Sequence, residues 1–281
     1  MNAPSVVQRV PGFDLGSRYP VTSEQIAQFN AEGFIKLKEV LPGDVIEHYR
    51  REIAAKVREL NTLHLPMEQR STYQKAFLQV TNIWTKSAIV KEFVFSKRLA
   101  RLATELLEVD GVRMYHDQAL YKEKGGGVTP WHADQYYWPL STDRTVTAWI
   151  PLQKTTPEMG PLAFAARSHH LTFGRELPIS DESEKKINEA LTAANFQYVD
   201  EPFDLGEVSF HLGWTFHRAG PNTSDRAREV MTVIYMDKDI RMTEPRNTAQ
   251  KADIAAWMAG TKPGEIPNTP LTPIMYSREE D

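Results

Sequence analysis

The sequence predicts a mainly β protein, a jelly roll of short strands with a helical buttress. Two patterns indicate this fold class. Helical periodicity dominates the first 107 residues, and short strand-like segments follow one another from Val112 onward, with no internal repeat. The length of 281 residues fits one undivided β domain, so we expect a single domain over residues 1–281.

Caps, chain breaks and apolar spacing define the elements of the first part. Thr22 or Ser23 can cap a helix whose apolar face includes Ile26 and Phe29. Pro42-Gly43-Asp44 breaks the chain and makes Asp44 a candidate helix N-cap. The predicted elements, in chain order, are an irregular arm at 1–20, a short helix from residue 22, a strand at 33–37, a helix at 45–60 and a helix at 97–107 that Asp110-Gly111 ends.

Glycine, proline and alternating apolar residues divide the rest of the chain into strands. Gly125-Gly126-Gly127 predicts a flexible loop, and Pro130 predicts an extended entry to Trp131-His132. The predicted elements are strands at 112–121, 145–152, 206–212, 215–219 and 229–236, a polar helical insertion at 180–194, and a Pro- and Thr-rich tail at 246–281 that wraps the surface.

Composition excludes several classes of protein. A net charge of −4 and an isoelectric point near 6.1 give no reason to expect nucleic acid or an anionic membrane as partner. No apolar run approaches the roughly 20 residues of a membrane span, and residues 1–18 lack the apolar core of a signal peptide. The absence of cysteine excludes disulfides, thiolate metal sites and cysteine nucleophiles, and we expect a cytoplasmic protein.

His132-Ala-Asp134 places two metal-ligand side chains two residues apart. On a strand, residues i and i+2 point to the same face, so both can contact one ion. Two histidines and one carboxylate on one face of an ion form the facial triad of non-heme Fe(II) oxygenases, which leaves coordination positions open. Alone, such a pair is far more often a surface or turn pair than a metal site, so a third ligand from another strand is required. His169-His170 could also bind metal, and we interpret it instead as a loop near the mouth of the site.

His217 is the candidate third ligand because of the residues that follow it. Gly220-Pro221-Asn222 predicts a turn, and Arg228 lies eleven residues after His217, so a hairpin would return its guanidinium to the same cavity. A planar guanidinium can bind a carboxylate through two parallel hydrogen bonds. His211 is the alternative ligand, and Arg226 is the alternative arginine because it shares the strand face of Arg228.

These residues lie in longer segments that resemble the Fe(II)/2-oxoglutarate dioxygenases of the phytanoyl-CoA dioxygenase family. Residues 121–132 (YKEKGGGVTPWH) are similar to that family's approach to its first iron ligand. Residues 206–217 (GEVSFHLGWTFH) are similar to the strand that carries its second histidine, and residues 25–40 resemble its opening helix and strand. The resemblance covers most of the chain, from about Val21 to Met236.

The resemblance implies a double-stranded β-helix, also called cupin-like, that uses Fe(II), 2-oxoglutarate as cosubstrate, and dioxygen. His132, Asp134 and His217 would be the catalytic metal ligands. Arg228 would bind the far carboxylate of 2-oxoglutarate. The carboxylate of Asp134 argues against a halogenase, because a halide needs the coordination position that the carboxylate fills.

Three further side chains would lie beside the cosubstrate if the resemblance holds. Trp149 is on the strand after the His132-Ala-Asp134 motif, where the family often has tryptophan, and Gln118 precedes that motif. Gln79 is a looser correspondence. One departure is Ala219, because some relatives carry a hydroxyl residue two positions after the histidine. Ser224 or another group would have to replace that contact.

The aromatic run Tyr136-Tyr137-Trp138 directly follows the first two ligands. If the extended conformation persists as far as Pro139, Tyr136 and Trp138 share the face of His132 and contact the substrate. Tyr137 would then point into the scaffold. An aromatic wall with one phenol suits an apolar or ring-containing substrate with a polar handle.

The sequence therefore predicts a dioxygenase that oxidises a small organic molecule and releases succinate and carbon dioxide. A metal-dependent hydrolase is an alternative, because two histidines and one carboxylate also suit Zn²⁺ with an activated water. A non-catalytic jelly-roll binding protein is a second alternative. The identity of the substrate and the oligomeric state are not predicted.

Overall fold

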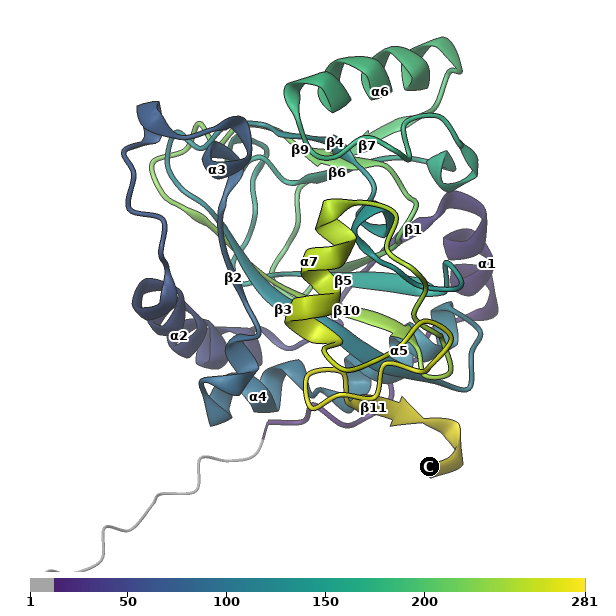
Figure 1. Cartoon of the computed structure of the whole chain (residues 1–281). Helices are drawn as coiled ribbons and strands as arrows, with labels where there is room; N and C mark the ends of the chain where they lie inside the picture. The colour runs from purple at the N-terminus through teal and green to yellow at the C-terminus, as the bar shows by residue number, and fades with distance from the viewer. Residues whose placement is uncertain (1–12, 281) are drawn as a thin grey trace, which may run out of the picture.

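The computed structural model of the chain describes residues 13–280, in which two antiparallel sheets face each other with helices outside them (Figure 1). This arrangement confirms the predicted jelly roll. Most of the expected arm, residues 1–12, lies outside the described residues. Phe13 and Leu15, which follow, have no regular secondary structure and pack against the main core.

The major sheet has seven strands in the order β1-β8-β5-β10-β3-β11, and β2 pairs with β3 beside that path. Its strands are β1 (Phe34–Leu37), β2 (Leu78–Thr81), β3 (Gly111–Lys122), β5 (Thr145–Pro151), β8 (Val208–Leu212), β10 (Arg228–Asp237) and β11 (Ile274–Ser277). The minor sheet has four strands in the order β4-β9-β6-β7. They are β4 (Thr129–His132), β6 (Leu162–Ala165), β7 (Tyr198–Asp200) and β9 (His217–Ala219).

Seven α-helices and six 3-10 helices connect the strands within residues 13–280. The α-helices are α1 (Ser23–Glu32), α2 (Gly43–Leu60), α3 (Thr72–Ala76), α4 (Ala88–Val94), α5 (Lys97–Leu106), α6 (Asp181–Ala193) and α7 (Thr248–Trp257). The 3-10 helices are η1 (Met67–Gln69), η2 (Ile83–Thr85), η3 (Asp134–Tyr137), η4 (Pro157–Met159), η5 (Ser168–His170) and η6 (Arg278–Glu280). Within that range, no helix is both long and apolar enough to cross a membrane.

Strand alternation sorts the side chains of the major sheet between a core and a cavity. On β5, Val146, Ala148 and Ile150 pack into the main core with α1, α2, α4 and α5, whereas Thr147 and Trp149 face the space between the sheets. The helical buttress therefore covers one face of the major sheet. The other face, opposite the minor sheet, is left to form the site.

Local signals in the sequence locate most elements to within a few residues. Thr22 caps α1 in a capping box with Gln25, and Ser180 caps α6 in the same way. One cap differs from the prediction: α2 begins at Gly43 after Pro42, and Asp44 lies in its first turn instead of capping it. The extended entry predicted at Pro130 to His132 is β4, whereas the short strands β2, β6 and β7 and the helices α3 and α4 were not predicted, because each is too brief to show a period.

The expectation that residues 246–281 only wrap the surface is wrong for two segments. Residues 248–257 form α7, and Ile254, Trp257 and Met258 pack with Tyr115 and other apolar residues against the major sheet. Residues 274–277 add β11 to the edge of β3. Figure 1 shows α7 lying in front of β3 and β10. The C-terminal segment thus forms part of the fold.

Candidate metal centre

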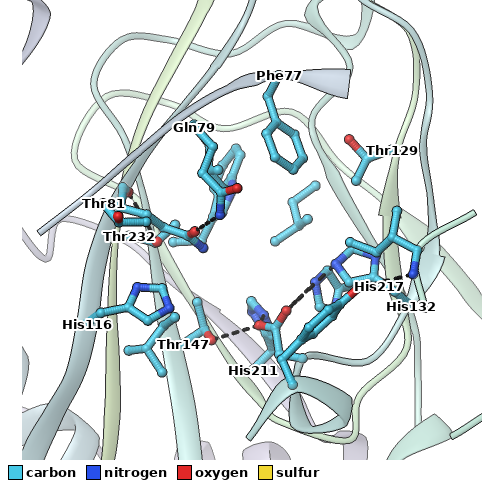
Figure 2. Close-up of a pocket in the computed structure, with 18 of the residues that line it drawn as sticks. Phe77, Gln79, Thr81, His116, Thr129, His132, Thr147, His211, His217 and Thr232 are labelled. Carbon is cyan, nitrogen blue, oxygen red and sulfur yellow. Dashed lines mark hydrogen bonds and ion pairs between the residues drawn. The ribbon is translucent and has the colours of Figure 1, made fainter. Parts of the chain in front are cut away.

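A cavity of about 360 Å³ lies between the two sheets and is bordered by α3, η3 and α7. Side chains from β2, β3, β5, β8 and β10 form one wall, and side chains from β4, β6 and β9 form the other. Figure 2 shows these side chains pointing into one shared space. The cavity collects every residue that the sequence predicts to hold metal or cosubstrate, namely His132, Asp134, His217, Arg228, Trp149, Gln118 and Gln79.

His132, Asp134 and His217 form the one grouping of metal-ligand side chains found among the described residues, with ligand atoms within 4.8 Å of one another. The β4–β9 pairing sets His132 directly opposite His217. Asp134 Oδ1 lies 3.7 Å from His132 Nε2 and 3.6 Å from His217 Nε2. Asp134 follows the end of β4 through Ala133, whose backbone is still extended, so the two-residue spacing keeps both side chains on one face.

Backbone carbonyls fix the orientation of both imidazoles. His132 Nδ1 donates to Pro130 O at 2.7 Å, and His217 Nδ1 donates to Thr215 O at 2.9 Å. With Nδ1 protonated, each Nε2 presents its lone pair to the shared centre, which is the tautomer that a metal needs. Burial lowers the pKa of His132 to about 3 and that of His217 to about 4, so both rings are neutral at pH 7.

The carboxylate of Asp134 is held by two further side chains. Thr147 Oγ1 donates to Asp134 Oδ2 at 3.0 Å, and His211 Nε2 lies 3.3 Å from the same oxygen. Burial favours the neutral acid, but His217 and His211 outweigh it and hold the pKa of Asp134 below its usual range. Two neutral nitrogens and one carboxylate oxygen thus converge at one point, and these donors fit a divalent first-row metal ion.

The other histidines considered as metal ligands lie outside the ligand grouping. His211 on β8 contacts Asp134 instead of joining the ligand grouping. His169 and His170 lie in η5, and His169 lines a separate surface hollow with Asn30 and Trp214.

Arg228 lies at the start of β10, is 2% exposed, and has no ion-pair partner among residues 13–280. Its Nη1 donates to Gly160 O, while its buried Nε has no hydrogen-bond acceptor. Burial lowers the pKa of this guanidinium to about 9. Burying a cation without a counter-ion costs free energy, unless an anionic ligand bound in the cavity pairs with it. Arg226, by contrast, is exposed and lines a separate hollow with Ser224.

The predicted hairpin between His217 and Arg228 is wrong. The chain crosses from β9 in the minor sheet to β10 in the major sheet. Buried Asn222 stabilises the crossing, because its Nδ2 donates to the carbonyl oxygens of Lys122 and Arg226 at 2.9 and 2.8 Å. Arg228 still faces the metal site, now from the opposite wall of the cavity.

The hydroxyl absent at Ala219 is not replaced by Ser224. Ser224 Oγ donates to Asn222 Oδ1 at 2.6 Å in the crossing, outside the cavity. Thr129 is instead the register partner of Ala219, and its side chain lines the cavity. Lys122 Nζ donates to Thr129 Oγ1 at 3.2 Å and to Gly127 O. This exchange could not be predicted, because it depends on the pairing of β4 with β9.

Gln79 and Gln118 lie together on the major sheet beside the cavity, as Figure 2 shows for Gln79. Gln79 Nε2 donates to Gln118 Oε1 at 2.5 Å, and Tyr73 Oη donates to Gln79 Oε1 at 2.6 Å. The β2–β3 register brings both glutamines to this edge. Trp149 on β5 stands beside Arg228, whose Cζ lies 5.4 Å from the ring centroid.

The predicted facing of Tyr136 and Tyr137 is wrong. Residues 134–137 form the 3-10 helix η3, so the alternation of a strand ends at Asp134. Tyr137 and Trp138 line the cavity, whereas Tyr136 does not. The carbonyl oxygen of Tyr136 accepts a hydrogen bond from Gln250 Nε2 at 2.9 Å, which ties η3 to α7.

Several cavity residues were not predicted at all. His116 and Thr147 come from strands that were predicted, but which face of the sheet their side chains occupy depends on the strand register. Asp253 and Trp257 come from α7. Their spacing of four residues places them on one face of a helix, and that spacing was the available signal.

Comparison with known proteins agrees with this geometry. A family model described as phytanoyl-CoA dioxygenase (PhyH) matches residues 29–230. A probable alpha-ketoglutarate-dependent hypophosphite dioxygenase of Stutzerimonas stutzeri is 21% identical over 233 residues, which cover 77% of this chain and 79% of the relative.

Two solved structures share the fold. The non-heme alpha ketoglutarate dependent carbocyclase SnoK, from nogalamycin biosynthesis, has a TM-score of 0.74 at 22% identity, covering 91% of this chain and 96% of SnoK. The epimerase SnoN, solved in complex with Fe³⁺, alpha ketoglutarate and nogalamycin RO, has a TM-score of 0.72 at 19% identity, covering 90% of this chain and 98% of SnoN.

Proposed function

The chain belongs to the phytanoyl-CoA dioxygenase family of Fe(II)/2-oxoglutarate-dependent oxidoreductases, and from this premise we propose that it oxidises a small organic substrate at one Fe(II) site. His132, Asp134 and His217 would hold the iron, and Arg228 would bind the far carboxylate of 2-oxoglutarate. Residues 1–281 would act as one catalytic domain.

The observation that carries the proposal is that the metal-ligand grouping and an unpaired buried guanidinium share one cavity. A dicarboxylate that reaches from the metal to Arg228 would supply the missing counter-charge. Thr129 Oγ1 accepts from Lys122 Nζ, so its O–H is free to donate to the same carboxylate. Trp149 and the glutamine pair would confine the carbon chain between the two ends.

When bound, iron supplies the activation of dioxygen, and the protein supplies binding, orientation and a dry cavity. For a hydroxylation the overall conversion is R–H, dioxygen and 2-oxoglutarate to R–OH, succinate and carbon dioxide. Thr147 and His211 would hold Asp134 in its coordinating orientation. The backbone acceptors of His132 and His217 would keep both Nε2 atoms available.

The hydrolase alternative accounts for the three ligands but leaves the unpaired Arg228 without a role. A binding protein without activity would not explain why both imidazoles are held in the tautomer that a metal needs. A small-molecule partner is supported by the size of the cavity, about 360 Å³. The cytoplasmic location stays a prediction from composition.

The test is to load the protein with Fe(II) under anaerobic conditions, add 2-oxoglutarate, and admit dioxygen. We expect succinate to form only when iron, 2-oxoglutarate and dioxygen are all present, slowly even without primary substrate. Asp134→Ala should form none, whereas Asp225→Asn, an exposed carboxylate away from the cavity, should behave as the wild type. Succinate formation by Asp134→Ala, or none by the iron-loaded wild type, would contradict the proposal.

A further inference from the structure

The cavity has a second end, on the far side from Arg228. Along β10 the cavity-facing side chains run from Arg228, opposite Lys122, to Ile234, opposite His116. Six residues of strand separate these ends by roughly 20 Å. Thr147, which orients Asp134, is the register partner of Ile234 on β5, so the metal ligands lie toward this second end.

Asp253 of α7 lines the second end and carries a charge that no described residue neutralises. Tyr115 Oη donates to its Oδ2 at 2.6 Å, and no lysine or arginine of residues 13–280 forms an ion pair with it. Burial raises its pKa to about 6, so the group is mostly a carboxylate at neutral pH. A carboxylate in this position favours a cationic guest.

Aromatic side chains surround Asp253. Trp257 lies one helical turn after it and has its ring centroid 5.2 Å from that of His116. Trp138 and Tyr137 complete the wall from the η3 side. The indole and phenol faces offer cation–π contact to an organic cation. The indole N–H of Trp257 lies beside the Asp253 carboxylate and, with Tyr115, favours its charged form.

The charges that line the cavity disfavour an anionic substrate at this end. The charged groups among the described residues that line the cavity are Asp134, Arg228 and Asp253, since burial lowers the pKa of His116, His132 and His217 and His211 is hydrogen-bonded to Asp134. Iron and Asp134 carry a net charge of +1, and Arg228 adds another. The dianionic cosubstrate cancels both, which leaves the carboxylate of Asp253. An acyl-CoA or an anion such as hypophosphite would therefore meet a negative group and no free cation.

We propose that the primary substrate is a small organic cation, with a protonated amine or similar nitrogen that Asp253 binds within the aromatic wall of Trp257, Trp138 and Tyr137. This inference rests on the proposed function, because it takes Arg228 as occupied by the cosubstrate. The nitrogen would anchor the substrate at α7, and the bond to be oxidised would lie between that anchor and the metal ligands.

Three probes of similar size separate the possibilities: benzylamine, benzyl alcohol and benzoate. Calorimetry on the anaerobic protein with Fe(II) and saturating 2-oxoglutarate should show benzylamine binding most tightly and benzoate least. Asp253→Asn keeps an oxygen acceptor for Tyr115 and should weaken benzylamine about 10- to 100-fold, the range for a hydrogen bond to a charged group, while leaving benzyl alcohol unchanged. Asp225→Asn is the control and should bind all three probes as the wild type does.

Asp253→Glu retains the charge and should retain the preference for the amine, and thermal melting of each variant establishes that it folds. Tighter binding of benzoate than of benzylamine, or an unchanged preference in a folded Asp253→Asn, overturns the proposal. A failure of the proposed dioxygenase function would give a different result from a failure of this substrate proposal. In that case succinate does not form and 2-oxoglutarate does not bind, while benzylamine binding still reports on Asp253.

Discussion

Thr129 lies directly opposite Ala219 in the β4–β9 pair, so a hydroxyl and a methyl group share one stretch of cavity wall. Thr129→Val removes the hydroxyl at almost constant shape. We expect the Kd of 2-oxoglutarate to rise about tenfold, because one hydrogen bond to a charged group is lost. Calorimetry on the anaerobic Fe(II) protein measures the change.

The same pair offers a rescue. Ala219→Ser, added to Thr129→Val, returns a hydroxyl from the facing strand, and part of the lost affinity should return with it. Equal 2-oxoglutarate affinity in Thr129→Val and wild type would show that the hydroxyl does not contact the cosubstrate.

Arg228→Lys tests the second group proposed to bind the far carboxylate of 2-oxoglutarate. Lysine keeps the charge but loses the two parallel hydrogen bonds, so binding of 2-oxoglutarate should weaken by about 1–3 kcal/mol. Arg226→Lys is the matched control, since Arg226 is exposed and lines a different hollow. A larger loss in Arg226→Lys than in Arg228→Lys would reverse the assignment.

The metal ligands can be separated from the residue that orients them. His132→Ala, Asp134→Ala and His217→Ala should each abolish specific Fe(II) binding in an anaerobic titration. His211→Ala should weaken it about 10- to 100-fold, the usual cost of losing a contact that orients a ligand. Retained binding in His217→Ala together with complete loss in His211→Ala would exchange the two roles.

Local spacing was sufficient to predict which side chains the fold brings together as candidate metal ligands. His132 and Asp134 are two residues apart, and Arg228 follows His217 at a short interval, so chain proximity placed them correctly even though the connection is a crossing between sheets. Thr129 and His116 face the cavity because of strand register, which depends on pairing between distant segments. Tyr136 was misplaced because a 3-10 helix replaces the strand after Asp134.

Asp117 provides a prediction for stability. It is fully buried, its carboxylate accepts the backbone N–H groups of Ile83 and Trp84 at 2.9 and 3.1 Å, and burial raises its pKa to about 7. A carboxyl whose pKa is raised on folding stabilises the fold at low pH, and this contribution is lost as pH rises from about 4 to 7. The slope attributable to Asp117 is at most about 1.4 kcal/mol per pH unit.

Asp117→Asn should flatten that slope. The variant is expected to be less stable throughout, because an amide cannot accept both N–H groups. Denaturant unfolding at pH 5, 6, 7 and 8 gives the difference between wild type and variant, which should shrink as the pH rises. A difference that stays constant would mean that Asp117 is ionised over the whole range.

The position of α7 along the chain has a consequence for how enzymes of this kind diversify. The family model matches residues 29–230, and α7 begins afterwards, at Thr248. The helix that carries Asp253 and Trp257 therefore lies outside the segment that the family model describes, although it packs against the same sheet. If Asp253 and Trp257 select the substrate, changes within the ten residues of α7 would alter which molecule is oxidised without touching the residues that would hold the iron and 2-oxoglutarate.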